Sequence, residues 1–123
     1  MVLAGIGSGS SVSYGRTWTA CEDSRIATVP IGYGDGYSRA LSNKGEVIIR
    51  GRRLPIVGRI CMDQLMVDLG PDGEAYNGDE VLLFGVKGSD YLPVESLCEK
   101  LGTIPYEILC LIGSRVPRIY VEE

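Results

Sequence analysis

Hydrophobic and polar positions alternate along this 123-residue chain in short runs that glycines separate. Runs of about four to eight residues with this alternation are typical of β-strands. The pattern predicts extended segments at residues 25–29, 46–50, 52–57, 64–69, 80–85 and 118–121. A turn near Gly51, where glycine adopts a positive φ at little cost, joins the second and third segments into a hairpin. Pro55 lacks an N–H group and therefore predicts an edge strand or a strand end.

Helical periodicity is found only in the last third of the chain. One helical face is predicted from apolar residues at the spacing i, i+3, i+4 and i+7, namely Val94, Leu97, Cys98 and Leu101. Pro93 precedes this helix and Gly102 follows it, as is usual at helix boundaries. A second short helix is predicted with Thr103 as its N-cap, Pro105 in its first turn and Gly113 after its end.

These elements predict a mainly β fold, a closed Greek-key-like β-barrel with two short α-helices in the last third. The stretch GIGSGSS at residues 5–11 has nothing to bury, so residues 1–11 are expected to form a flexible lead-in. Residues 12–123 have the size of one domain with a single core. Met1 is compatible with a start inside a longer gene.

Composition excludes several classes of function. The net charge of −4, without a run of Lys or Arg, gives no electrostatic basis for nucleic-acid binding. No apolar stretch approaches the length of a membrane span, and the first residues do not have the pattern of a secretion signal, so a cytoplasmic protein is expected. The four cysteines form no CxxC pair and there is no histidine, so no metal site is expected.

The absence of histidine also limits acid–base chemistry near neutral pH to carboxylates, Tyr, Lys, Cys or groups from outside the chain. Tyr occurs seven times, against one Phe and one Trp. Tyr14 stands out because Gly15 allows close approach and Arg16 is a nearby cation. A phenol titrates near about 10, so a Tyr base needs positive charge and low dielectric around it. The alternative is that Tyr14 is a structural aromatic residue at a strand end.

Four segments, VSYGRTWTA, VPIGYGDGYSR, PIVGRICMDQ and TIPYE, resemble in their order the C-terminal domain of alanine racemase, a bacterial pyridoxal phosphate enzyme. The resemblance covers about Val12 to Val121 and also implies the barrel fold. It implies that Tyr14 is the base that removes the α-proton from one enantiomer. It further implies that the backbone N–H of Met62 contacts the substrate carboxylate. Without the motif, Met62 would be interpreted as a core methionine.

The resemblance assigns roles to further residues. Tyr33, Asp35, Arg39 and Ile104 are expected at the substrate entrance, and Tyr106 within reach of the cofactor phosphate. Asp63 either orients an arginine of the cofactor-binding barrel or closes a turn. Without the resemblance, residues 33–39 would be a solvated turn and Tyr106 a surface residue of an amphipathic helix. Gly34 stands where many family members have alanine, a change expected to be small. The closing RVPRIYV segment is expected to be structural, with Val116, Ile119 and Val121 packed and Pro117 ending the pairing on one side.

Racemisation requires proton carriers on both faces of the α-carbon, so one tyrosine is not sufficient. In the family the opposite group is a lysine that holds pyridoxal phosphate as a Schiff base, and it belongs to an N-terminal (β/α) barrel. None of Lys44, Lys87 and Lys100 lies in a segment that resembles it. The cofactor is therefore expected on a separate barrel, in a head-to-tail homodimer whose active site this chain completes.

The resemblance thus implies interconversion of L-alanine and D-alanine, which supplies D-alanine for peptidoglycan, with this chain inactive by itself. One alternative is a racemase of serine or another small amino acid. Another, of a different class, is a non-catalytic dimerisation or binding barrel.

Overall fold

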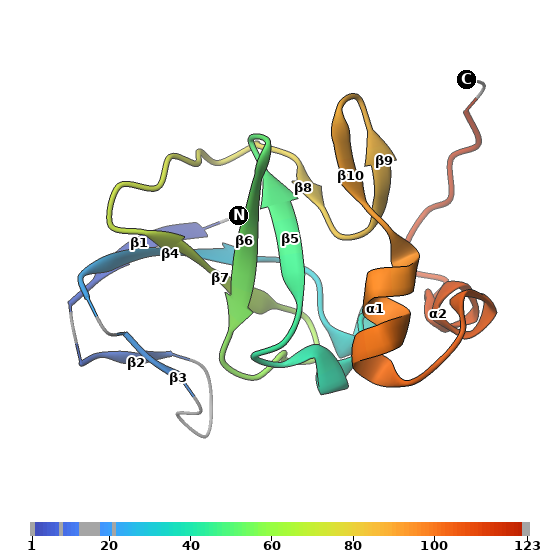
Figure 1. Ribbon diagram of the computed structural model, residues 1–123, viewed down its shortest axis with the longest axis horizontal. Coiled ribbons are helices and arrows are strands. Elements are labelled where there is room, and N and C mark those ends of the chain that lie inside the picture. Colours follow the sequence, from blue (N-terminus) through green and yellow to red (C-terminus); the bar gives the residue numbers. More distant parts are fainter. Residues whose placement is uncertain (1, 8, 13–17, 21, 122–123) are drawn as a thin grey trace.

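Six antiparallel strands form the central sheet in the computed structural model, which describes residues 2–7, 9–12, 18–20 and 22–121. The strand order is β1-β4-β7-β6-β5-β8. The bounds are β1 Val2–Ile6, β4 Ser24–Val29, β7 Leu65–Gly70, β6 Arg52–Val57, β5 Glu46–Ile49 and β8 Val81–Leu82. Two hairpins, β2 Ser11–Val12 with β3 Trp18–Thr19 and β9 Gly85–Lys87 with β10 Asp90–Leu92, form separate small sheets. Figure 1 shows the two helices at one end of the molecule and β2–β3 at the other.

The predicted hairpin is confirmed, since β5 and β6 pair through Ile49 and Arg52 around a two-residue turn. Both turn residues have positive φ, 52° at Arg50 and 76° at Gly51, as a type I′ turn requires. The prediction for Pro55 was wrong, because β6 has neighbours on both sides. Pro55 is tolerated there because its strand partner is Glu46 of β5 alone. The pairing of β6 with β7 begins only at the next residue, Ile56.

The predicted lead-in is wrong for residues 2–6, which form β1 and pair with β4 along its whole length. The glycine-rich composition that suggested a flexible segment begins only at Gly5, at the end of this strand. Of the strand predicted at residues 80–85, only Val81–Leu82 lie in the central sheet, as β8. The predicted strand at 118–121 is absent from the described residues, because this segment extends into solvent with Ile119 and Val121 exposed and no strand beside it.

The expectation of a mainly β fold with two helices in the last third is confirmed. Closure of the barrel is not confirmed. Within the described residues, β1 and β8 are the two edges of the sheet, and no pairing joins them. The closed barrel therefore stays a prediction.

Both helices occur where the sequence predicted them. Helix α1 spans Val94–Leu101 and ends at Gly102 in the left-handed conformation. Helix α2 spans Pro105–Leu111, and its N-cap is Ile104, not the predicted Thr103. The N–H of Thr103 donates to the carbonyl of Cys98, so this residue terminates α1 and the chain is extended at Ile104 before α2 begins.

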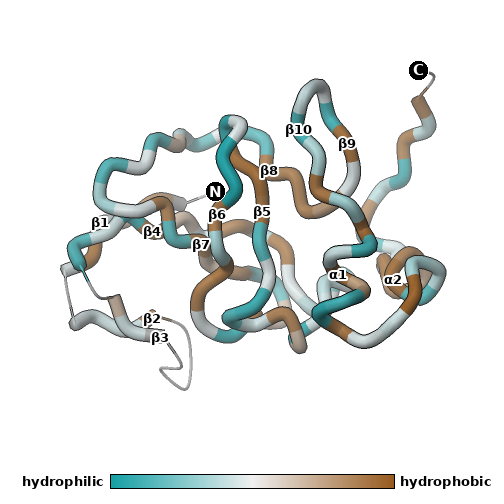
Figure 2. Tube along the Cα trace, viewed as in Figure 1, coloured by the Kyte–Doolittle hydropathy of each residue, from teal (hydrophilic) through white to brown (hydrophobic). Residues whose placement is uncertain are grey.

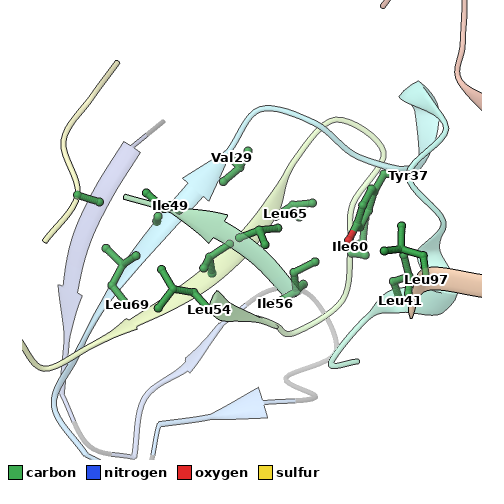
Figure 3. Close-up of a cluster of buried hydrophobic side chains, with 14 of the residues drawn as sticks. Val29, Tyr37, Leu41, Ile49, Leu54, Ile56, Ile60, Leu65, Leu69 and Leu97 are labelled. Carbon is green, nitrogen blue, oxygen red and sulfur yellow. The ribbon is translucent and has the colours of Figure 1, made fainter. Parts of the chain in front are cut away.

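The main core lies between the sheet and the helices. Figure 3 shows side chains from β5, β6 and β7 converging with Leu41 and Leu97 from the helical side. Strand β7 alternates as the sequence predicted, with Leu65, Val67 and Leu69 buried. A smaller cluster of Val12, Ile26 and Val57 covers the opposite face. Figure 2 shows the short apolar stretch of β5, whose Val47 and Ile49 belong to the main core.

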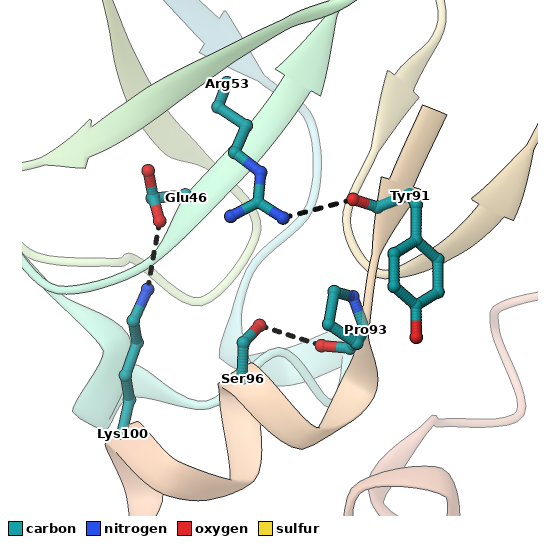
Figure 4. Close-up of polar contacts among 6 residues, drawn as sticks. All are labelled: Glu46, Arg53, Tyr91, Pro93, Ser96 and Lys100. Carbon is teal, nitrogen blue, oxygen red and sulfur yellow. Dashed lines mark hydrogen bonds and ion pairs between the residues drawn. The ribbon is translucent and has the colours of Figure 1, made fainter. Parts of the chain in front are cut away.

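Polar contacts attach α1 to the sheet (Figure 4). Lys100 of α1 contacts Glu46 of β5 at 3.4 Å, and Arg53 of β6 donates to the carbonyl of Tyr91 in β10 at 3.1 Å. Ser96 donates to the carbonyl of Pro93 at 2.8 Å within the first turn of α1. The first two contacts link α1 and β10 to the β5–β6 hairpin, whereas the third lies within α1.

Candidate functional site

Residues 32–37, here called the clamp loop, lie directly against the segment that carries Met62. The N–H of Tyr33 donates to the carbonyl of Cys61 at 3.0 Å, and the N–H of Gly34 donates to the carbonyl of Met62 at 2.8 Å. A Cβ at Gly32 would lie 2.1 Å from the carbonyl oxygen of Cys61, so only glycine allows this approach. The structure therefore brings together two of the segments that the sequence singled out.

The side chains of Ser42 and Asn43 accept hydrogen bonds from the backbone just before Met62. The N–H of Ile60 donates to the hydroxyl of Ser42 at 2.8 Å, and the N–H of Gly58 donates to the side-chain carbonyl of Asn43 at 2.7 Å. Ser42 in turn donates to the carbonyl of Arg39 at 2.6 Å. The backbone at Met62 is therefore fixed by neighbours on both sides.

The Met62 N–H has no acceptor among the described residues, whereas its carbonyl is paired. The Met62 side chain is 60% exposed, which excludes the interpretation as a core methionine. An N–H without an acceptor, in an exposed residue whose neighbouring backbone is hydrogen-bonded, is chemically suited to bind an anionic oxygen. Tyr33, which is also exposed, lies next to it through the Cys61 hydrogen bond.

Asp35 does not line an open entrance, and the prediction for it is corrected. Its side chain is 1% exposed and accepts from Arg115 Nε at 2.6 Å, with a second contact to Arg115 Nη2. The other carboxylate oxygen accepts from the N–H of Gly32 at 3.2 Å. The Arg115 hydrogen bond holds the pKa of Asp35 below its usual value despite the opposing effect of burial. Asp35 is thus an ionised anchor inside the clamp loop.

The clamp loop contains a short 3-10 helix, η2, at Tyr33–Asp35. Arg39 begins a second 3-10 helix, η3, at Arg39–Leu41, shortly after the clamp loop. Arg39 and Arg59 line the same surface depression of about 420 Å³, together with Ala40 and Ser42. Arg59 was missed by the sequence analysis, although it stands in the GRICMD segment three residues before Met62. Asp63 is exposed at the end of this segment.

Ile104 and Tyr106 lie at the N-terminal end of α2, and both are exposed, Tyr106 by 77%. The first turn of α2 offers little for an anion by itself, because Pro105 lacks an N–H and Glu107 adds a negative charge. The phenol of Tyr106 is the group that can donate there. The C-terminal end of α2, rather than this end, contacts the clamp loop, where a Cβ at Gly36 would lie 2.1 Å from the carbonyl oxygen of Leu111.

Tyr14 stands between β2 and β3 in the sequence and lies outside the described residues. Its role therefore stays a prediction. Arg118 of the closing segment donates to the carbonyl of Leu109 at 3.2 Å. The packing predicted for Ile119 and Val121 is wrong, because both side chains are exposed.

An apolar cavity of about 310 Å³ lies behind the clamp loop and is lined by leucine, isoleucine and aromatic side chains of the sheet and both helices. Tyr37 borders it, but the hydroxyl of Tyr37 is buried among core residues and has no partner in the described part of the chain. Burial raises the pKa of this phenol. With its apolar walls, the cavity does not suit a zwitterionic amino acid.

Two of the lysines are engaged in ion pairs, Lys87 with Glu80 at 2.7 Å and Lys100 with Glu46 at 3.4 Å. Within the described ranges, no three His, Cys, Asp or Glu side chains gather as metal ligands would. No helix in this part of the chain has the length and hydropathy needed to cross a bilayer.

Comparison with known proteins gives consistent matches across the chain. The family model "Alanine racemase, C-terminal domain" matches residues 2–120. The alanine racemase of Cutibacterium acnes is 59% identical over 113 residues, which cover 92% of this chain and 30% of that protein. The alanine racemase of Desulfovibrio desulfuricans is 55% identical over 114 residues, 93% of this chain and 30% of that protein.

Solved structures of alanine racemases also match this chain. The alanine racemase of Streptomyces coelicolor superposes with a TM-score of 0.92 at 41% identity, covering 99% of this chain and 32% of that chain. The alanine racemase of Bartonella henselae, a structure with covalently bound pyridoxal phosphate, gives a TM-score of 0.88 at 41% identity, covering 97% of this chain and 32% of that one. The chain thus spans about 30% of the length of the curated relatives it matches.

Proposed function

We propose that this chain, which belongs to the family of alanine racemase C-terminal domains, contributes the tyrosine base and a substrate-carboxylate contact to an enzyme that interconverts L-alanine and D-alanine. The observation that carries the proposal is the match of residues 2–120 to that domain, at up to 59% identity to proteins named alanine racemase. All four predicted motifs fall within the matched range.

In the proposed site, the α-carboxylate of the substrate accepts a hydrogen bond from the Met62 N–H. The lack of an acceptor for this N–H, the exposure of Met62 and the hydrogen-bonded backbone around it support this role. The phenol oxygen of Tyr14 removes the α-proton from L-alanine and returns a proton to the same face in the reverse direction. Tyr33, Arg39 and Ile104 are proposed to line the approach to this point, and Asp63 to orient a partner arginine.

The cofactor proposed for the whole enzyme is pyridoxal phosphate. When bound, it acts as an electron sink that makes the α-proton removable. The residues of this chain fit part of its binding, because the exposed phenol of Tyr106 can donate to a phosphate oxygen. No lysine here lies in a segment resembling the one that holds the cofactor in the family, so the covalent attachment is proposed on an N-terminal barrel outside this chain.

The proposed partner is a second subunit whose barrel covers the site. Large apolar side chains remain exposed on the α2 side of the molecule, among them Tyr106, Leu109 and Leu111. Several exposed large apolar side chains on one short helix are consistent with a surface that another domain covers.

The proposal is tested in a hybrid racemase, made by replacing the matching segment of the Cutibacterium acnes alanine racemase with this chain. We expect the hybrid to racemise alanine faster than serine, and the 123-residue chain alone to be inactive with added pyridoxal phosphate. A soluble hybrid that binds the cofactor but does not racemise alanine would contradict the proposal. A clear preference for serine would reassign the substrate.

Tyr14→Phe in the hybrid racemase tests the base. General acid–base catalysis contributes about 10²–10⁴-fold, so exchange of the α-proton of L-alanine in D₂O, followed by NMR, should slow at least about 100-fold. Exchange from D-alanine should fall much less, because the opposite group removes that proton. Tyr120→Phe, on the exposed C-terminal segment, is the matched control. Equal slowing for both enantiomers would refute the assignment.

A further inference from the structure

Asp35 and Arg115 are eighty positions apart in the sequence, yet they form a tight ion pair in the fold. The carboxylate is almost fully enclosed, while the guanidinium is 69% exposed. A charged group this well enclosed requires a partner, because desolvation without one is costly. Arg115 therefore has a defined task, to keep a buried carboxylate ionised inside the clamp loop.

Hydrogen bonds hold the clamp loop to two other segments of the chain. On one side, its N–H groups at Tyr33 and Gly34 bind the carbonyls of Cys61 and Met62. On the other side, the N–H of Gly113 donates to the backbone carbonyl of Asp35 at 2.9 Å, next to the Arg115 ion pair. Through these backbone hydrogen bonds, the clamp loop links the Met62 segment to the chain that follows α2.

The Asp35 carboxylate also sets the shape of the loop itself. Its second oxygen accepts from the N–H of Gly32, three residues earlier, at 3.2 Å. The same loop turn presents the Tyr33 and Gly34 N–H groups toward the Met62 segment. One side chain therefore connects the internal conformation of the loop, its attachment to the segment after α2, and the position of the Met62 backbone.

We infer that Asp35 and Arg115 are a positioning pair that fixes the Met62 N–H for binding the substrate carboxylate. The inference rests on the proposed function, since it assumes that Met62 makes this contact. Neither side chain touches the substrate. A hydrogen bond to the carboxylate is made equally in the ground state and the transition state, so its displacement raises KM and leaves kcat little changed.

The test uses Asp35→Asn and Arg115→Lys in the hybrid racemase. Asn keeps the shape of Asp but loses the charge. Lys keeps the charge but lacks the two guanidinium nitrogens, Nε and Nη2, that both contact one Asp35 oxygen. For Asp35→Asn we expect the KM for alanine to rise about tenfold with kcat within about threefold of the parent. Arg115→Lys should give a smaller change in the same direction. Inhibition by propionate, which carries a carboxylate without an amine, should weaken in parallel with KM.

Glu46→Gln is the matched control, because it removes another ion pair between sequence-distant elements, the contact of Glu46 with Lys100, away from the clamp loop. Its KM should equal that of the parent hybrid. If Asp35→Asn lowers the melting temperature but leaves KM and propionate inhibition unchanged, the pair is only structural and the inference is wrong. If Asp35→Asn does not yield soluble enzyme, Arg115→Lys decides by the same criteria.

Failure of the inference is distinguishable from failure of the proposed function. An inactive parent hybrid speaks against the function, whereas an active parent with unaltered KM in both variants speaks against the positioning pair alone.

Discussion

Gly32→Ala is expected to be strongly destabilising for purely steric reasons. Gly32 has φ −156° and ψ −163°, an extended conformation open to alanine, so no backbone strain is involved. The new Cβ would lie 2.1 Å from the Cys61 carbonyl oxygen, about 1.3 Å short of ordinary contact at 3.4 Å. It would also lie 2.7 Å from the carbonyl carbon and oxygen of Met62. Backbone atoms cannot turn aside as a flexible side chain does, so the two segments must separate.

A separation of that size breaks the hydrogen bonds of Tyr33 to Cys61 and of Gly34 to Met62, now 3.0 and 2.8 Å long. Each bond contributes about 1 kcal/mol net, and overpacking costs about 1–3 kcal/mol, so the total loss is about 3–5 kcal/mol. Urea unfolding of the 123-residue chain measures it. In the hybrid racemase the same change should raise KM, because the Met62 N–H moves.

Gly5→Ala is the control, since a Cβ there meets nothing within 4 Å and the backbone needs no positive φ. It should change stability by less than about 1 kcal/mol, and in the favourable direction. If Gly32→Ala proves as stable as Gly5→Ala, the close approach of the clamp loop to the Met62 segment is not a feature of the protein.

Two further predictions concern buried ionisable groups. Tyr37→Phe removes a buried hydroxyl without a partner and should raise the free energy of unfolding by about 1 kcal/mol at neutral pH. Because burial raises the pKa of Tyr37, wild-type stability should fall as the pH rises above about 10, and Tyr37→Phe should lose less; equal losses in urea titrations would contradict this. The pKa of Asp35 is lowered, so its stabilisation relative to Asp35→Asn is fully present above about pH 4 and should shrink as the pH falls further. A difference in unfolding free energy that stays constant from pH 7 to pH 3 would argue against an ionised Asp35.

Local patterns predicted much of this fold because the deciding interactions are local. The alternation in β7, the I′ turn at Arg50 and Gly51 and the boundaries of α1 all depend on residues within a few positions of one another. The strand β1 was missed because its partner β4 lies about twenty positions later, and its own sequence carries only a weak extended signal. Thr103 was misassigned because two helix boundaries compete within three residues.

For the candidate site too, local motifs were predicted and contacts between distant parts of the sequence were not. The motifs located Tyr33 and Met62, and the fold places their segments side by side. Burial of Asp35 could not be predicted, because its partner Arg115 lies in a segment that the sequence analysis treated as packing. Arg59 carried a signal in the GRICMD segment that was not used, and its position beside Arg39 becomes evident only in three dimensions.

The distribution of exposed and buried groups separates the catalytic proposal from the alternative of a simple binding barrel. A domain that only mediated association would need an apolar surface, and the exposed side chains around α2 supply one. It would have no need for a Met62 N–H without an acceptor, or for a buried carboxylate inside the loop that binds the Met62 carbonyl. A buried charge is costly to retain, so its place in the loop that holds Met62 is better explained by a requirement for accurate geometry at the Met62 N–H. Under the proposed function, the remaining chemistry comes from groups that this chain does not carry, so we propose that this geometry serves a substrate bound between this domain and another.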